Sequence, residues 1–289
     1  MDQKLEISIM MRRRRKNKLF HFLFLLATLF GVVALALLLA QVLVQGLSWV
    51  NWDFIFNYSS RIAKNAGIKA AIVGTFYIMI ITAPLSLIIG VSTAIYLEEY
   101  AKDTWISRLI QTNISNLAGI PSIVYGLLGL TVFVRILGFE RSILSGALTM
   151  TLLVLPIVIV ASQEAIKAIP NSQRMASYAL GANRWQTVIR ITLPSALPGI
   201  LTGAILSMSR AIGETAPLIV IGAVQYIAFL PSSIFDSFTV LPIQIYSWSA
   251  LPSKEFSNVA AAGIIVLLIM LLSMNAIAIF LRNKFQKKA

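Results

Sequence analysis

The sequence predicts an all-α integral membrane protein with six transmembrane helices, and two observations predict this fold class. Of the 289 residues, 58% are hydrophobic and only 12% are charged, whereas a soluble chain carries about a quarter charged residues. The apolar residues gather in stretches long enough to span a hydrocarbon core of about 30 Å as a helix. In lipid, a helix satisfies all of its own backbone hydrogen bonds, so we expect these stretches to be helical.

The apolar stretches follow one another between two basic tails, 1–18 and 282–289. The first stretch is too long for the apolar region of a cleaved signal peptide, and no small-residue cleavage site follows it, so we expect a retained anchor. The remaining five stretches form one transmembrane domain, 67–281. The expected spans are 19–45, 68–97, 117–137, 143–161, 196–229 and 259–281.

Basic and aromatic residues predict how the chain is oriented in the membrane. With both termini in the cytoplasm, the cytoplasmic segments hold seventeen Lys and Arg residues and the outer segments hold six. This asymmetry follows the positive-inside rule, so we expect both termini to be cytoplasmic. Four aromatic residues after the first span suit the belt of aromatic side chains at the outer interface: Trp49, Trp52, Phe54 and Tyr58.

The loop between the fourth and fifth spans, 163–194, predicts two short helices that project from the membrane. Asn171 can begin the first helix and Gly181 can end it. Asn183 can then begin the second helix, with Gln186 completing a capping box. An ordinary pair of amphipathic helices at the interface would show the same pattern.

The second of these helices has an apolar face and a proline at its expected end. We expect it to stop at Pro194, before the fifth span begins. The apolar residues recur at helical spacing: Trp185, Val188, Ile189 and Leu193.

The fifth span contains two charged residues, Arg210 and Glu214. An ion at membrane depth costs on the order of 3 kcal/mol, and such residues usually face a cavity or a partner. Because they are four residues apart, we expect them to share one face of the helix. They would form either a self-neutralising pair that holds two helices together, or an anion pathway in which Arg210 attracts the anion and Glu214 orients or gates it.

The residues around this pair favour the pathway. Pro217 would remove a backbone hydrogen bond to Gly213, and a broken helix at membrane depth is tolerated where it lines a cavity. The N-terminus of the restarted helix, which Thr215 can cap, attracts anions. Small residues at every fourth position of the same span predict close helix packing: Ser195, Gly199, Gly203, Ser207 and Ala211.

Part of the cytoplasmic loop resembles the EAA loop of ATP-binding-cassette (ABC) importer permeases. Gly181 is followed, after nine residues, by I-T-L-P, which is similar to the family motif G-x9-I-x-L-P. Met175 stands where the family usually has glutamate, and Ser177 stands where it usually has the second alanine. The resemblance implies the type I importer permease fold and a loop that docks on a separate ATPase subunit through Ala176, Ser177, Gly181, Ala182, Asn183 and Trp185.

The chain has no G-x4-G-K-[ST] phosphate-binding loop of its own. The energy for transport would therefore come from the ATPase partner. We expect that partner to bind ATP and magnesium, and this chain to bind no cofactor and to be no enzyme.

Three further segments resemble the PstA family of phosphate importer permeases: 71–75 (A-I-V-G-T), 119–130 (G-I-P-S-I-V-Y-G-L-L-G-L) and 209–218 (S-R-A-I-G-E-T-A-P-L). The resemblance extends from Gly67 to the C-terminus. It implies half of a translocation pore in the cytoplasmic membrane of a bacterium or archaeon. The implied partners are a PstC-like permease, two PstB-like ATPase subunits and an extracytoplasmic PstS-like phosphate-binding protein.

On this resemblance, Arg210, Glu214 and Thr215 would line the translocation pathway. The helices of the pore would bend at two prolines and two glycines, which are Pro121, Gly126, Gly213 and Pro217.

Other functions fit the sequence less well. A sulfate, molybdate or phosphonate importer would share the EAA loop but should lack R-x3-E-T-A-P. A secondary transporter or channel would more often show inverted repeats and several intramembrane ionisable residues. An enzyme is least expected, because the chain has no cysteine, only one histidine (His21) and no carboxylate cluster at membrane depth.

Overall fold

The computed structural model describes residues 2–224 and 226–286, and every regular element in this part of the chain is a helix. Five helices are long and apolar enough to cross a membrane: Lys16–Trp49, Lys69–Tyr100, Ile143–Lys167, Arg184–Ile212 and Lys254–Lys284. A sixth span results when the bent pair Trp105–Leu117 and Ser122–Ile136 is taken as one. The all-helical fold is confirmed, and the six expected spans correspond to these six segments.

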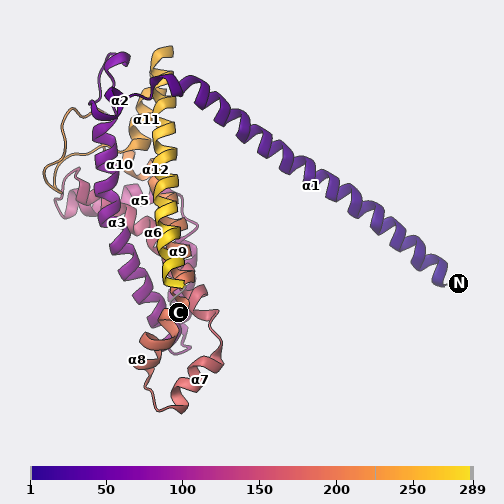
Figure 1. The fold of residues 1–289 in the computed structure, drawn as a ribbon. Helices are drawn as coiled ribbons and strands as arrows, with labels where there is room; N and C mark the ends of the chain where they lie inside the picture. The colour runs from indigo at the N-terminus through magenta and orange to yellow at the C-terminus, as the bar shows by residue number, and fades with distance from the viewer. Residues whose placement is uncertain (1, 225, 287–289) are drawn as a thin grey trace.

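The helices form a bundle with loops at its two ends (Figure 1). Two ends of the molecule can be recognised, because α7 and α8 project from one end, near the end of α12, and α2 lies at the other. In chain order the helices are α1 (Asp2–Gly46), α2 (Trp52–Phe56), α3 (Lys69–Ile95), α4 (Trp105–Leu117), α5 (Ser122–Gly129), α6 (Ile143–Lys167), α7 (Asn171–Ala179), α8 (Arg184–Thr187), α9 (Leu193–Ile212), α10 (Ala216–Ile221), α11 (Leu241–Ser249) and α12 (Lys254–Gln286). Wider π-helical turns follow three of them, at Tyr96–Tyr100, Leu130–Ile136 and Val188–Thr192.

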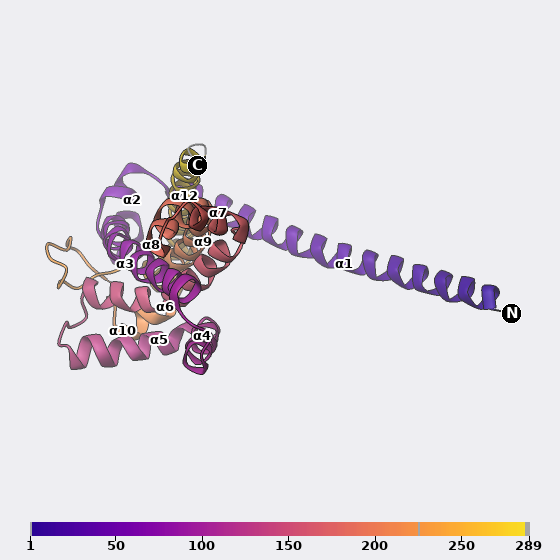
Figure 2. The ribbon, with the colours of Figure 1, turned by 90° about the horizontal axis from the view of Figure 1, so that it is seen from below.

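Helix α1 extends away from the bundle (Figures 1 and 2). Its large apolar side chains are exposed along its length, as in Phe24, Phe30 and Leu37. Its C-terminal end lies against α12, where a Cβ added to Gly46 would lie 2.6 Å from the carbonyl carbon of Ala261. An apolar helix exposed on all sides is suited to a lipid environment.

Small residues let α9 pack closely on α6. A Cβ added to Gly199 would lie 2.8 Å from the Cβ of Ala165, and one added to Gly203 would lie closer still to the Cβ of Ala161. The predicted packing role of the small-residue face is thus confirmed at these two glycines. Without a hydrophobic drive between helices in lipid, such close backbone approach is what holds them together.

The third span runs from Ser122 through the π-helical turn to Ile136, so the expected span 117–137 is confirmed except that it begins five residues later. Helices α4 and α5 meet at an angle of 105°, and Pro121 stands at the N-cap position of α5. Proline disfavours the helical conformation in the residue before it and fits the start of a helix, so it separates two helices here.

The fifth span differs from the prediction at both ends. Pro194 does not end the second loop helix, because α8, the π-helical turn Val188–Thr192 and α9 follow one another without interruption. Pro194 instead lies in the first turn of α9, where its missing N–H is tolerated. At the other end, α9 stops at Ile212, well before the expected end at 229.

Phe54 does not belong to an interfacial aromatic belt. Only 3% of Phe54 is exposed, and its ring centroid lies 5.8 Å from that of Trp248 in α11. Trp52, on the same short helix, is 75% exposed and remains at the surface. The α2 helix therefore presents one aromatic residue to the core and another to the surroundings.

Candidate functional site

The break after α9 holds the two charged residues singled out in the sequence. Arg210 lies in the last turn of α9 and is exposed, whereas Glu214 lies beyond the end of the helix and is half-buried. Because α9 ends at Ile212, the expectation that the two residues share one helix face is wrong. Within residues 2–224 and 226–286, Arg210 has no carboxylate at ion-pair distance.

Thr215 and Pro217 begin the short helix α10 that follows. Thr215 occupies the N-cap position, but its Oγ1 donates to the carbonyl of Gly213 at 3.5 Å and caps no N–H of α10. Pro217 lies in the first turn of α10, where its ring removes no helical hydrogen bond. The predictions of a threonine cap and of a hydrogen bond lost at Pro217 are therefore wrong, although the break itself is present.

Gly126 and Pro217 bring the two halves of the predicted pore region into contact. A Cβ added to Gly126 in α5 would lie 2.7 Å from the Cα of Pro217 in α10. Gly126 thus sits where α5 and α10 approach each other most closely. Gly213, by contrast, has open space around it, since the nearest atom to its added Cβ is the Arg210 carbonyl oxygen at 3.7 Å.

The cytoplasmic loop forms the two helices that the sequence predicts. Gly181 ends the first helix with a φ of +85°, a conformation that glycine adopts without strain. Asn183 Oδ1 accepts from the Gln186 amide at 2.9 Å, and Gln186 Oε1 accepts from the Asn183 amide at 3.0 Å. The capping box is confirmed. The first helix begins one residue earlier than expected, because Pro170 and not Asn171 holds the N-cap position.

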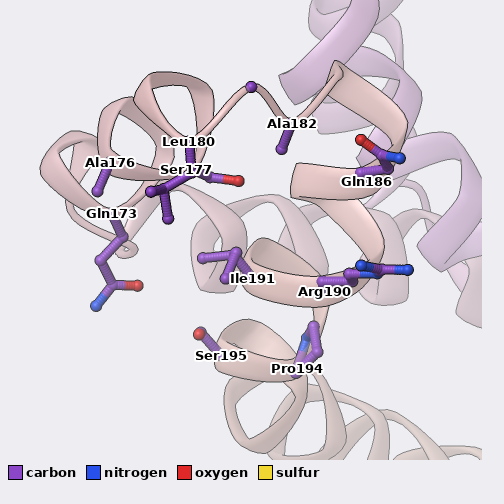
Figure 3. Close-up of a pocket in the computed structure, with 11 residues that line it drawn as sticks. Gln173, Ala176, Ser177, Leu180, Ala182, Gln186, Arg190, Ile191, Pro194 and Ser195 are labelled. Carbon is purple, nitrogen blue, oxygen red and sulfur yellow. The ribbon is translucent and has the colours of Figure 1, made fainter.

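A groove of about 850 Å³ separates α7 from the start of α9 (Figure 3). Ser177 and Thr187 share a hydrogen bond of 2.9 Å that ties α7 to α8. Large apolar side chains stand exposed around this projection, including Leu180 at 90% and Trp185 at 62%. The residues that line the groove are Gln173, Ala176, Ser177, Leu180, Gly181, Ala182, Gln186, Arg190, Ile191, Pro194 and Ser195.

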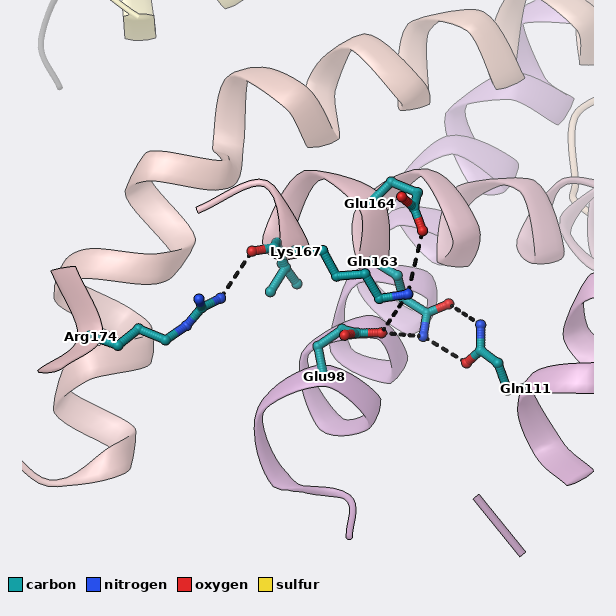
Figure 4. Close-up of polar contacts among 7 residues, drawn as sticks. Glu98, Gln111, Gln163, Glu164, Lys167 and Arg174 are labelled. Carbon is teal, nitrogen blue, oxygen red and sulfur yellow. Dashed lines mark hydrogen bonds and ion pairs between the residues drawn. The ribbon is translucent and has the colours of Figure 1, made fainter. Parts of the chain in front are cut away.

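Sequence reasoning missed a polar cluster that joins this loop to the bundle (Figure 4). Arg174 in α7 donates to Glu99 Oε1 at 3.0 Å, to the Ile166 carbonyl at 2.9 Å and to the Ile169 carbonyl at 2.8 Å. The side chain of Glu99 is only 8% exposed. The only signal in the sequence was the acidic pair that ends the second span, Glu98 and Glu99.

The exposed guanidinium of Arg210 is available to bind an anion. The hydrogen bonds of Arg174 connect the cytoplasmic loop to the bundle and can pass movement between them. The described residues hold no group of three or more His, Cys, Asp or Glu side chains that could bind a metal ion.

Comparison with known proteins places the fold among importer permeases. One chain of the bacterial alginate ABC transporter, in complex with its pentasaccharide-bound periplasmic protein, aligns with a TM-score of 0.65 at 14% identity, covering 91% of this chain and 93% of that chain. A chain of the inward-facing MetNI methionine ABC transporter aligns with a TM-score of 0.61 at 18% identity, covering 73% and 94%.

Sequence comparison gives nearer relatives. The probable ABC transporter permease protein YqgI of Bacillus subtilis is 32% identical, over 96% of this chain and 99% of its own length. The phosphate transport system permease protein PstA of Mycobacterium leprae is 34% identical over 88% and 82%, and that of Yersinia pestis is 30% identical over 94% and 92%.

Residues 86–288 match the family described as binding-protein-dependent transport system inner membrane component. This match covers most of the chain and agrees with the importer fold of the bundle. The chain belongs to this family of inner membrane components and is a non-catalytic permease subunit of a binding-protein-dependent ABC importer.

Proposed function

We propose that this permease is the PstA-type half of an ATP-driven importer of inorganic phosphate. Relatives named as phosphate transport permeases support the proposal, because they match nearly the whole chain at 30–34% identity. The string R-A-I-G-E-T-A-P from Arg210 to Pro217, which resembles the PstA family, also supports it. The partners would be a PstC-like permease, an ATPase dimer of PstB type and an extracytoplasmic phosphate-binding protein of PstS type.

The observation that carries the proposal is the exposed guanidinium of Arg210 beside a break in a membrane helix. A guanidinium presents five N–H donors in a planar fork that matches the oxygens of a phosphate ion. A charge at this depth is costly unless it faces water, a partner or a ligand. Arg210 would attract the anion during passage, and Glu214 and Thr215 would shape the same stretch of the pathway.

The positions around the break would allow the pathway to change shape. Gly213 is free of close neighbours, so it would act as the hinge between α9 and α10. Pro121 and Gly126 would fix how α5 turns and where it rests on Pro217. The pathway would thus be bordered by short, separately movable helices.

The cytoplasmic projection would couple this pathway to ATP hydrolysis. Apolar side chains exposed around this projection, which α7 and α8 form, suit a protein partner. Here the partner would be the ATPase subunit, which would also hold ATP and magnesium. Movement of the two ATPase subunits toward each other would move the projection and open the pore outward. The contact residues would be Ala176, Ser177, Gly181, Ala182, Asn183 and Trp185.

The test is substrate selection by the complete system in proteoliposomes, with its own binding protein supplied outside. We expect ATP-dependent uptake of labelled phosphate that persists in excess sulfate or molybdate and disappears when the ATPase subunits are omitted. Uptake of sulfate or molybdate in place of phosphate would overturn the phosphate assignment and favour another oxyanion importer. The family membership would stand in either case.

A further inference from the structure

Helices α4 and α5 form an elbow at one side of the bundle, on the far side of α6 from α12 (Figure 2). The hydroxyl of Tyr125 in α5 donates to the Leu117 carbonyl of α4 at 2.8 Å, across the 105° bend. The same carbonyl also accepts from the Ile120 amide at 3.1 Å. The Tyr125 bond joins the two helices across the bend, so a shift of α4 can be passed to α5.

Few contacts hold α4 to the rest of the molecule. Ile114 is its buried residue, while Trp105, Ile106 and Leu109 are more than half exposed. Its polar attachment is a reciprocal amide pair with α6, in which Gln111 Nε2 donates to Gln163 Oε1 at 2.9 Å and Gln163 Nε2 donates to Gln111 Oε1 at 2.8 Å. Within the described residues, α4 is thus joined to the rest of the bundle by one pair of polar side chains.

Gln163 is the buried member of this amide pair, Gln111 is half-buried, and a carboxylate extends the pair. Gln163 is 1% exposed, and its Nε2 also donates to Glu98 Oε1 at 2.9 Å (Figure 4). Both N–H groups and the oxygen of the Gln163 amide are therefore used. A buried polar network of this kind is favourable when complete and unfavourable when partly broken, so α4 is held in discrete arrangements.

The same π-helical turn that carries Glu98 also carries Glu99, the partner of Arg174 in α7. Neighbouring residues on one turn therefore contact α6 and α4 on one side and the cytoplasmic loop on the other. π-Helical turns are often found at functional sites in helices. Displacement of α7 would pull on Glu99 and thereby on the hydrogen bonds of Glu98.

We propose that the Gln111–Gln163 amide pair, held by Glu98, is a latch that passes movement of the cytoplasmic loop to α4 and α5. Because α5 rests on Pro217 through Gly126, the movement reaches the break that contains Glu214. This proposal depends on the proposed function in one respect, which is that a partner ATPase moves the cytoplasmic loop. It does not depend on which anion is transported.

The absence of cysteine from the sequence permits a direct test. Trp105→Cys places one thiol at the exposed start of α4, and a water-soluble maleimide reports its accessibility in the complete complex, nucleotide-free and ATP-bound. We expect ATP to change the labelling rate by about fivefold, the lower end of measured coupling between sites. In the Gln111→Leu variant this change should disappear while ATP binding persists.

The control is Asn113→Leu in the same helix. Asn113 donates only to the Leu109 carbonyl within α4, so its removal should leave the ATP response intact. The double variant Gln111→Leu and Gln163→Leu replaces both amides and serves if the single variant fails to assemble. An ATP response that persists in either latch variant, or that is missing in the Trp105→Cys chain alone, would overturn the latch. Failure of phosphate uptake would instead bear on the substrate assignment.

Discussion

Two arginines in this permease have opposite surroundings. Arg174, at the cytoplasmic end, is 15% exposed and uses its guanidinium on Glu99, on two backbone carbonyls and on Asn171 Oδ1 at 3.0 Å. Arg210, in the last turn of α9, is exposed and makes no ion pair within the part of the chain that the structure describes. One arginine donates from all three guanidinium nitrogens, and the other has its donors free.

The difference distinguishes an arginine that stabilises the fold, Arg174, from one that is available to bind a ligand, Arg210. A guanidinium whose three nitrogens all donate fixes the elements that supply the acceptors, which here are the π-helical turn after α3, the end of α6 and the start of α7. A guanidinium left exposed on an apolar helix is compensated by water, a partner or a ligand. The comparison predicts that changing Arg174 affects stability first, and that changing Arg210 affects transport.

The largest effect on stability is expected from Arg174→Gln. The change leaves the buried carboxylate of Glu99 without its partner, and breaking such a pair costs about 3 kcal/mol. We expect a clearly lower unfolding temperature of the purified complex, measured by tryptophan fluorescence or light scattering, whereas Arg210→Gln should unfold with the unmodified complex. Equal loss of stability in the two variants would break the comparison.

A tightly packed glycine in α9 and an open one in α1 offer a second comparison of this kind. Gly203→Val inserts side-chain atoms where α9 lies against Ala161 of α6, and overpacking of this kind costs about 1–3 kcal/mol. Gly31→Val in α1 is the matched control, because nothing lies within 4 Å of a Cβ added there. The unfolding temperature of the complex should fall only for Gly203→Val. A comparable fall for Gly31→Val would mean that the close packing of α9 on α6 is not the cause.

The smallest effect is expected at Asp236, a half-buried residue in the loop before α11. Hydrogen bonds from the Ser232 amide, the Ser233 amide and the Ser232 hydroxyl lower the pKa of Asp236 below its usual value. The stabilisation is therefore present above the usual aspartate pKa of about 3.9 and is lost as the pH falls through the lowered value. Protection of residues 232–236 against hydrogen exchange, relative to the intrinsic rate at each pH, should fall in that acidic range, and Asp236→Asn should remove this pH dependence of the protection.

Features set by local sequence were predicted well. The apolar spans, the αL glycine at Gly181 and the capping box of Asn183 each depend on residues within one or two turns. The small-residue face of α9 was also recognised, because its four-residue period is visible without knowing the partner helix. These features place the cytoplasmic projection and the charged break in the correct elements.

Features set by distant residues were not predicted. Arg174 and Glu99 are 75 residues apart, and Gln111 and Gln163 are 52 apart, so no local pattern reveals either contact. The apolar sequence beyond Ile212 resembles a continuing helix, but its chain turns back to pair Val224 with Phe238, which is buried in the core. Distant packing therefore ends the helical part of this span at α10, before the expected residue 229, whereas the break between α9 and α10 was visible in the local sequence.

The central claim is that Arg210 lies in the path of the transported anion. The most direct test is ATP-driven phosphate uptake by the complete system carrying Arg210→Gln, with Arg135→Gln, another exposed arginine in a membrane helix, as control at matched complex levels. A charge-assisted contact worth about 2 kcal/mol predicts a loss of about 30-fold for Arg210→Gln and uptake near normal for Arg135→Gln. Undiminished uptake by the Arg210→Gln complex would contradict the account.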